Sequence, residues 1–163
     1  MFVAAAIAAA FVAPDPMEIF RIALQYVPQR SRFAAAVVNS MEYVRTSRDW
    51  LEAYEKIHAR YREFGGCAIY QEIGTVINAV RFSKDAGDGI GMQVAQGNDT
   101  DSFGCTCGSI LGAYHGPEGL DRRWLAPRND TIHTTLADFH EQRLSAVAAR
   151  MGRLPARLAD GKT

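Results

Sequence analysis

The residues best suited to chemistry lie in one short turn, residues 97–102, which reads GNDTDS. It carries two carboxylates two residues apart, Asp99 and Asp101, with hydroxyl groups at Thr100 and Ser102. Carboxylate and hydroxyl oxygens are hard ligands that suit Mg²⁺ or Mn²⁺. Residues two apart do not face each other on a regular helix, but a turn between two helices can point both carboxylates the same way. The hexapeptide therefore indicates a candidate metal site.

A helix N-terminus would explain the same residues without a metal. Asp and Thr accept hydrogen bonds from the free N–H groups there, and negative charge suits that end of the helix dipole. Capping therefore stays an alternative interpretation of Asp99 and Asp101. An EF-hand loop that starts at Asp99 is excluded, because it would need Asp or Asn at position 103 and Glu at position 110, where the chain has Phe103 and Ile110. The turn at 85–91 lacks a later acidic ligand, so we interpret its acids as turn formers.

The helix predicted after the turn, from about 101 to 115, carries a glycine at every fourth position: Gly104, Gly108 and Gly112. Each glycine in a helix costs about 1 kcal/mol relative to alanine, so we expect another backbone or a ligand to approach this face closely. An apolar stripe lies on its flank: Phe103, Cys107, Ile110, Leu111 and Tyr114. A helix held on two sides keeps the acidic turn rigid, which favours a metal site over a simple cap.

Helical spacing of apolar residues and helix-end signals predict the elements that position this turn. The predicted helices cover about residues 2–12, 16–27, 31–44, 49–64, 68–83, 89–96, 101–115 and 134–151. No stretch alternates steadily between apolar and polar residues, so no strand is predicted. We therefore predict an all-α fold class, with one helical domain over residues 1–151 and a flexible tail at 152–163.

The composition is that of a globular protein, with 48% hydrophobic and 22% charged residues. Basic and acidic residues number 18 each, and a chain without a basic excess is a poor candidate for binding nucleic acid. The three cysteines are too few for a disulfide framework or a structural zinc site. No run is long enough to span a bilayer, and the apolar start at 1–13 lacks the positive residues of a signal peptide. We therefore expect no membrane partner and a cytoplasmic location.

The residues from 97 to 116, GNDTDSFGCTCGSILGAYHG, resemble the ADP-ribosylglycohydrolase family. The hallmark of that family is a Gly-x-Asp-Thr-Asp-Thr/Ser turn, followed by a small-residue helix that ends Gly-Ala-x-x-Gly. The similarity is spread over most of residues 1–140. It includes residues 23–37, residues 87–96, Leu120, Trp124 and residues 129–132. The resemblance implies a multi-helix ADP-ribosylglycohydrolase-like domain.

This resemblance also implies a hydrolase with a pair of Mg²⁺ ions near its centre, with Mn²⁺ as a possible substitute. The turn would supply Asp99, Asp101 and the hydroxyl of Ser102 as metal ligands. The metals would hold the substrate ribose, and Asp99 and Asp101 would be the catalytic carboxylates that promote attack of water at its anomeric carbon. The implied substrate is an ADP-ribosylated protein or an ADP-ribose-like small molecule with an N- or O-glycosidic linkage.

The chain departs from the family pattern in two ways. Asn98 stands where the family usually has Gly, and Asn tolerates the left-handed backbone of a turn. Family members are also much longer, and their N-terminal half carries a Glu and a Thr-Asp-Asp turn that nothing here matches. The resemblance therefore implies an N-terminally truncated domain that keeps part of the metal site. The alternatives are a non-catalytic, crystallin-like structural or interaction protein of the same fold, and a small helical protein whose turn only caps.

Overall fold

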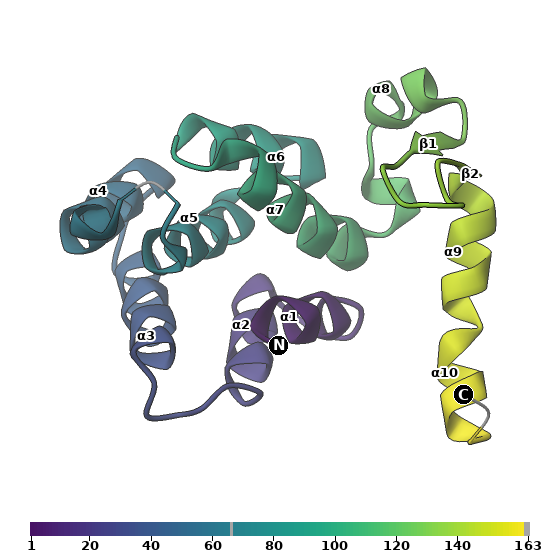
Figure 1. Cartoon of the computed structure of the whole chain (residues 1–163). Coiled ribbons are helices and arrows are strands. Elements are labelled where there is room, and N and C mark those ends of the chain that lie inside the picture. The colour runs from purple at the N-terminus through teal and green to yellow at the C-terminus, as the bar shows by residue number, and fades with distance from the viewer. Residues whose placement is uncertain (66, 162–163) are drawn as a thin grey trace. The chain divides into compact units, whose positions relative to one another are not determined.

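Helices follow one another along the chain, and the fold class is all-α (Figure 1). The computed structural model describes residues 1–65 and 67–161, and the chain divides into two compact units, Met1–Leu120 and Asp121–Thr163. The first unit contains α1 (Phe2–Ala10), α2 (Pro16–Leu24), α3 (Arg32–Arg45), α4 (Trp50–Tyr61), η1 (Arg62–Phe64), α5 (Ile69–Phe82), α6 (Ala86–Ala95), α7 (Thr100–His115) and η2 (Pro117–Gly119). The second contains α8 (Arg122–Leu125), η3 (Ala126–Arg128), β1 (Thr131–His133), β2 (Glu141–Arg143), α9 (Leu144–Gly152) and α10 (Leu154–Ala159).

The sequence did not indicate a division after residue 120. The assignment of residues 1–151 to one domain stays a prediction, and so does the tail at 152–163, whose last two residues lie outside the described ones.

Side-chain caps set where several helices begin. Asp15 accepts hydrogen bonds from two backbone N–H groups of the first turn, at 2.9 and 3.1 Å, so α2 begins as predicted. Ser31 and Asp49 cap α3 and α4 in the same way. Asp85 caps α6, which therefore begins three residues before the predicted start at residue 89.

Helix α5 is the central helix of the first unit. Residues 71–80 are all buried, and in Figure 1 α5 lies between α3 and α4 on one side and α6 and α7 on the other. Gly74 lets α5 pack closely, because a Cβ there would lie 2.8 Å from Ile57 of α4 and 2.8 Å from Ser40 of α3. Burial of the apolar side chains along this helix is the main driving force that assembles the unit.

Helices α6 and α7 pack closely at glycine, but the closest approach is not on α7. It occurs at Gly89 of α6, where a Cβ would lie 2.1 Å from Cδ1 of Leu111. On α7, a Cβ at Gly108 would meet Ile90 at 3.1 Å, whereas one at Gly112 would meet no described atom within 4 Å. A Cβ at Gly104 would meet a side-chain atom of Val94 at 3.7 Å. Among the described residues the predicted approach of another backbone is therefore wrong, and the approach of a ligand stays a prediction.

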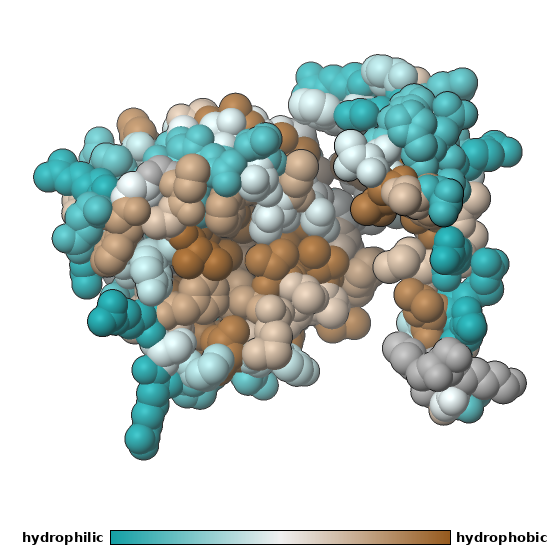
Figure 2. All heavy atoms as spheres, viewed as in Figure 1, coloured by the Kyte–Doolittle hydropathy of each residue, from teal (hydrophilic) through white to brown (hydrophobic). Residues whose placement is uncertain are grey.

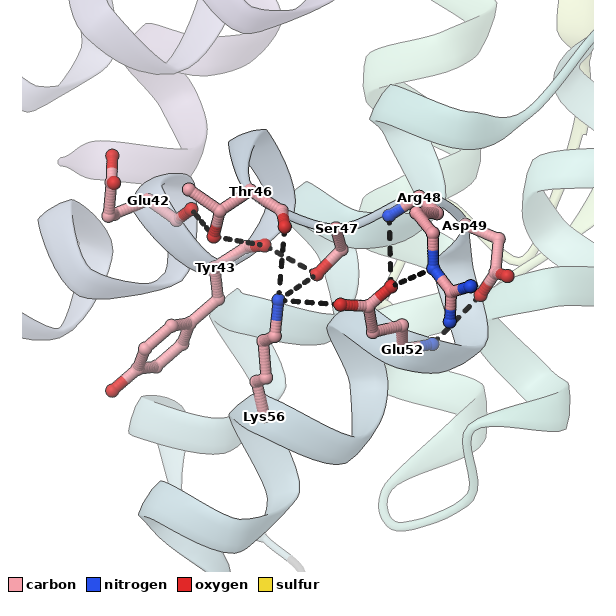
Figure 3. Close-up of polar contacts among 8 residues, drawn as sticks. All are labelled: Glu42, Tyr43, Thr46, Ser47, Arg48, Asp49, Glu52 and Lys56. Carbon is pink, nitrogen blue, oxygen red and sulfur yellow. Dashed lines mark hydrogen bonds and ion pairs between the residues drawn. The ribbon is translucent and has the colours of Figure 1, made fainter.

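A polar cluster fixes the connection between α3 and α4 (Figure 3). Nζ of Lys56 donates to the carbonyl oxygen of Thr46 at 3.1 Å and to the hydroxyl of Ser47 at 2.9 Å. The same ammonium group lies 2.9 Å from Oε1 of Glu52. Arg48 donates to Oε2 of Glu52 from its backbone N–H at 3.1 Å and from Nε at 2.9 Å. These contacts, first with Lys56 and then with Arg48, lower the pKa of Glu52 to about 2.

The second unit departs from the helix predicted at 134–151. Strands β1 and β2 pair in antiparallel fashion, and the N–H of Thr134 donates to the carbonyl oxygen of His140 at 2.7 Å. Asp138, in the loop between the strands, has a φ of 57°, a left-handed conformation that interrupts a helix. The predicted helix is therefore wrong over residues 134–143. Each strand has only three residues, which is too short to show alternation in the sequence.

Apolar residues also reach the surface of the first unit, where hydrophobic atoms spread over the face seen in Figure 2. Helix α1 ends two residues before its predicted end, and Phe11 and Val12 are 72% and 78% exposed. An apolar groove of about 490 Å³ runs along α1 and α2. Its lining residues are Met1, Ala4, Ala5, Ala8, Ala9, Val12, Ile22 and Tyr26. In the described part of the chain, no helix has the length and hydropathy needed to cross a membrane.

We expect Gly89→Ala to destabilise the protein by about 1–3 kcal/mol, since the added methyl group meets Leu111 and Ser83 in a closely packed site. Gly91→Ala on the same helix is the matched control, because no described atom lies within 4 Å of a Cβ there. Alanine is the better helix former, so the control should be stabilised by up to about 1 kcal/mol. Urea unfolding measures both free energies, and equal values for the two variants would contradict the packing at Gly89.

The pKa of Glu52 predicts a pH-dependent contribution to stability. A carboxylate whose pKa is lowered on folding stabilises the protein above its ordinary value of 4.5, and this stabilisation is lost as the pH falls toward about 2. Glu52→Gln should therefore be less stable than the wild type at neutral pH. This difference in the free energy of unfolding should disappear as the pH falls from 4.5 to about 2. Urea unfolding across this pH range measures the difference. In a Lys56→Met background the difference should be smaller at every pH. A difference that does not change with pH would refute the lowered pKa of Glu52.

Candidate functional site

Two residues in the left-handed conformation reverse the chain between α6 and α7. Gly97 has a φ of 80° and Asn98 a φ of 65°. Glycine adopts such angles freely, and asparagine is one of the few other residues that do so without a large cost. Asn98 therefore fits the turn, although it departs from the family pattern. The reversal brings Asp99 to the N-cap position of α7.

The side chains of Asp99 and Asp101 lie next to each other. The pKa of Asp101 is below its ordinary value, first through its contact with the Asp99 side chain, and then because the backbone N–H groups of Ser102 and of Asp101 itself donate to it. Asp101 and Ser102 are exposed, and Asp99 is partly buried. The turn thus presents two neighbouring carboxyl groups and a hydroxyl group. Their assignment as metal ligands stays a prediction.

Asp99 occupies a cap position without using its side chain as a cap. Among the described residues, no backbone N–H donates a capping hydrogen bond to its carboxylate. Asp15, Asp49 and Asp85 stand at equivalent positions, and each of them accepts at least one such bond. The capping alternative therefore does not account for the Asp99 carboxylate.

Glu72 of α5 holds the turn through its backbone. Oε1 of Glu72 accepts a hydrogen bond from the N–H of Asp99 at 2.9 Å, although 27 residues separate them. The Glu72 side chain is fully buried, and its Oε2 has no hydrogen-bond partner among the described residues. Burial raises the pKa of Glu72; the Asp99 N–H opposes that shift, and the negative charge of Asp99 adds to it. The acidic turn is thus tied directly to the central helix.

Further hydrogen bonds extend this contact into a polar ladder, which we define as the buried residues Glu72, Thr75, Asn78, Gln93 and Gln96. Nε2 of Gln93 donates to the hydroxyl of Thr75 at 2.9 Å. Nε2 of Gln96 donates to the carbonyl oxygen of Thr75 at 3.1 Å, and Oε1 of Gln96 accepts from Asn78 at 2.7 Å. Because Gln96 directly precedes the turn, the chain is anchored on both sides of the two left-handed residues.

Sequence reasoning missed the ladder because it followed only the apolar face of the helix predicted at 68–83. The polar residues at 72, 75 and 78 are spaced by three and so share a helix face, and Gln93 and Gln96 have the same spacing. Polar residues aligned along a helix that is otherwise rich in Ile and Val were the available signal, since buried polar groups need partners. The packing of the helices decides which residues become the hydrogen-bond partners of these polar groups.

The donor set of the turn suits Mg²⁺ in kind but not in number. Asp99, Asp101 and Ser102 offer the oxygen atoms that this hard cation prefers, but they fill at most three of the six positions of an octahedral site. Over residues 1–65 and 67–161, no three His, Cys, Asp or Glu side chains form a group that could hold a metal ion. Glu72 therefore does not complete the ligand set, and further ligands would have to be water, substrate or other residues.

Comparison with known proteins confirms the family resemblance that the turn and its helix carry. A family model described as ADP-ribosylglycohydrolase matches residues 1–154 of the 163-residue chain. No curated protein and no solved structure matches it. The match covers nearly the whole chain, including the acidic turn, α5 and the polar ladder between them. The chain therefore belongs to the ADP-ribosylglycohydrolase family.

Proposed function

We propose that this chain carries part of the active site of a magnesium-dependent hydrolase that cleaves N- or O-glycosidic ADP-ribosyl linkages. The observation that carries the proposal is the pair of neighbouring carboxyl groups at Asp99 and Asp101, in a turn where Asp99 does not cap the helix. Asp99, Asp101 and the hydroxyl of Ser102 are the residues that would hold the cation. Mn²⁺ has the same ligand preference and would occupy the same place.

The chemistry that we propose follows from what these groups can do. When bound, the cation supplies positive charge that orients the hydroxyl groups of the substrate ribose. The lowered pKa of Asp101 keeps its carboxylate ionised at neutral pH. A carboxylate of this pair can then accept the proton of the water that attacks the anomeric carbon, as a general base. Asp101 and Ser102 are exposed, so a ribose can reach them from solvent.

The proposed substrate is an ADP-ribosylated protein or an ADP-ribose-like small molecule. The family match supports ADP-ribosyl chemistry in general, while the linkage and its carrier belong to this proposal. Since the turn fills at most half of an octahedral site, water, substrate oxygens or other protein groups would provide the remaining ligands.

A crystallin-like structural or interaction role is the second candidate. It is favoured by the incomplete ligand set and by a core that is packed through apolar side chains and the polar ladder. This alternative and the enzyme proposal differ in whether the folded chain responds to the cation and to the sugar nucleotide.

Thermal unfolding with and without Mg²⁺ plus ADP-ribose distinguishes the two. A ligand that binds only the folded state, at a hundred times its dissociation constant, adds about 2.7 kcal/mol of stability. We expect Mg²⁺ and ADP-ribose together to raise the melting temperature more than either alone. A cooperative transition that neither ligand shifts would favour the structural role and count against the hydrolase.

Asp99→Asn and Asp101→Asn should each abolish metal-dependent hydrolysis and the joint shift in melting temperature. Asparagine keeps the shape of the side chain but removes the charge that a divalent cation requires. Glu55→Gln is a suitable control, because Glu55 is exposed on α4, outside the turn. Release of ADP-ribose from ADP-ribosyl-arginine and ADP-ribosyl-serine measures activity. Undiminished turnover in either Asp variant would sink the assignment.

A further inference from the structure

Glu72 is an unusual residue for the place it occupies. Carboxyl groups are seldom fully buried unless a cation or a metal lies beside them. Glu72 is 0% exposed, yet its hydrogen bond from the protein comes from one backbone N–H, that of Asp99, at 2.9 Å. Its second oxygen, Oε2, is buried without a partner among the described residues. An apolar residue, such as its neighbour Ile73, would serve helix packing better, so the carboxyl group points to a role at the turn.

The hydrogen bond between Glu72 and the N–H of Asp99 restrains the part of the turn that has the fewest restraints from its own neighbours. Gly97 and Asn98 have positive φ angles, and the Asp99 side chain does not tie itself to the start of α7. Since the peptide unit is planar, holding the N–H of Asp99 fixes the plane between Asn98 and Asp99. Together with the start of α7 at the next residue, it restricts the direction in which the Asp99 side chain leaves the backbone. Helix α7 begins at the next residue, so the position of Asp101 follows from the same plane.

A second anchor, the side chain of Gln96, holds the other side of the turn. Thr75 and Asn78 share the face of α5 that carries Glu72, and together they hold the side chain of Gln96. Two anchors on one buried helix thus enclose a turn of two residues. A functional group is held accurately when the residues that support it are themselves fixed by packing and hydrogen bonds.

We propose that Glu72 is a positioning residue for the acidic turn: its Oε1 holds the N–H of Asp99, so that the carboxyl groups of Asp99 and Asp101 are presented together to a divalent cation. Glu72 does not contact the cation and acts through Asp99. The identity of the ligand rests on the proposed function, while the geometry of the turn does not. Removing a residue that orients a metal ligand weakens metal binding by roughly 10- to 100-fold.

Three variants separate positioning from general stability. Glu72→Met removes the acceptor and keeps the volume, and Glu72→Gln keeps an acceptor oxygen at the same place. Thr75→Val removes the hydroxyl that contacts Gln93 and the backbone carbonyl of residue 72. It keeps the backbone carbonyl that holds Gln96 and the contact of Glu72 with Asp99. The dissociation constant for Mn²⁺ alone, measured by electron paramagnetic resonance, should rise roughly 10- to 100-fold in Glu72→Met. It should rise much less in Glu72→Gln and stay unchanged in Thr75→Val, although the latter lowers the melting temperature.

Hydrogen exchange of the Asp99 amide is the second measurement, and it needs no metal. Loss of this hydrogen bond should speed its exchange by roughly 10-fold in Glu72→Met. The Asp99 amide should stay protected in Glu72→Gln and Thr75→Val. Amides in the middle of α7, such as that of Leu111, should exchange equally slowly in every folded variant.

The outcomes for Glu72 and for the proposed function are distinct. If the wild type binds Mn²⁺ and Glu72→Met binds it equally well, the positioning role is overturned and the hydrolase proposal stands. If the wild type does not bind Mn²⁺, the hydrolase proposal fails. Hydrogen exchange of the Asp99 amide then decides whether Glu72 positions the turn. Faster exchange in Glu72→Met alone would support positioning of the turn, and equal exchange in all variants would overturn it.

Discussion

The hydrogen bond from the N–H of Asp99 to Oε1 of Glu72 joins the acidic turn to the helix around which the first unit is packed. The rest of the polar ladder continues this contact along the same face of α5. Hydrogen bonds are stronger in a buried environment, and an unpaired polar group is more costly there. The ladder therefore favours one register between α5 and α6. That register places the chain reversal at Gly97 and Asn98 and the start of α7 directly after it.

The residues that stabilise the first unit and the residues of the proposed site lie in different parts of it. The core consists of apolar side chains from α1 to α7, with glycine at the closest helix contacts. The acidic turn contributes little to that core, since Asp101 and Ser102 are exposed and the Asp99 carboxylate caps no helix among the described residues. The hydrogen bond with Glu72 ties the turn to this core.

Much of the helical order could be read from local signals. Asp15, Ser31 and Asp49 mark helix starts through their own side chains, and the apolar spacing between them gives the helices their faces. The predicted helix was wrong at residues 134–143, where two strands of three residues each form a hairpin. Pairing with another strand, not a pattern within one strand, makes such a hairpin stable. Short strands therefore leave no reliable periodicity in the sequence.

The sequence by itself determined the all-α class, the acidic turn with its two carboxylates, and the resemblance that led to the family. These features depend on neighbouring residues, whose spacing is visible in the chain. Only the tertiary structure decided that Glu72 accepts from Asp99, that Gln96 reaches Thr75 and Asn78, and that Gly89 makes the closest helix contact. The physical reason is that a buried polar group or a glycine takes its partner from whichever helix packs against it. That choice is made by the packing of the whole core.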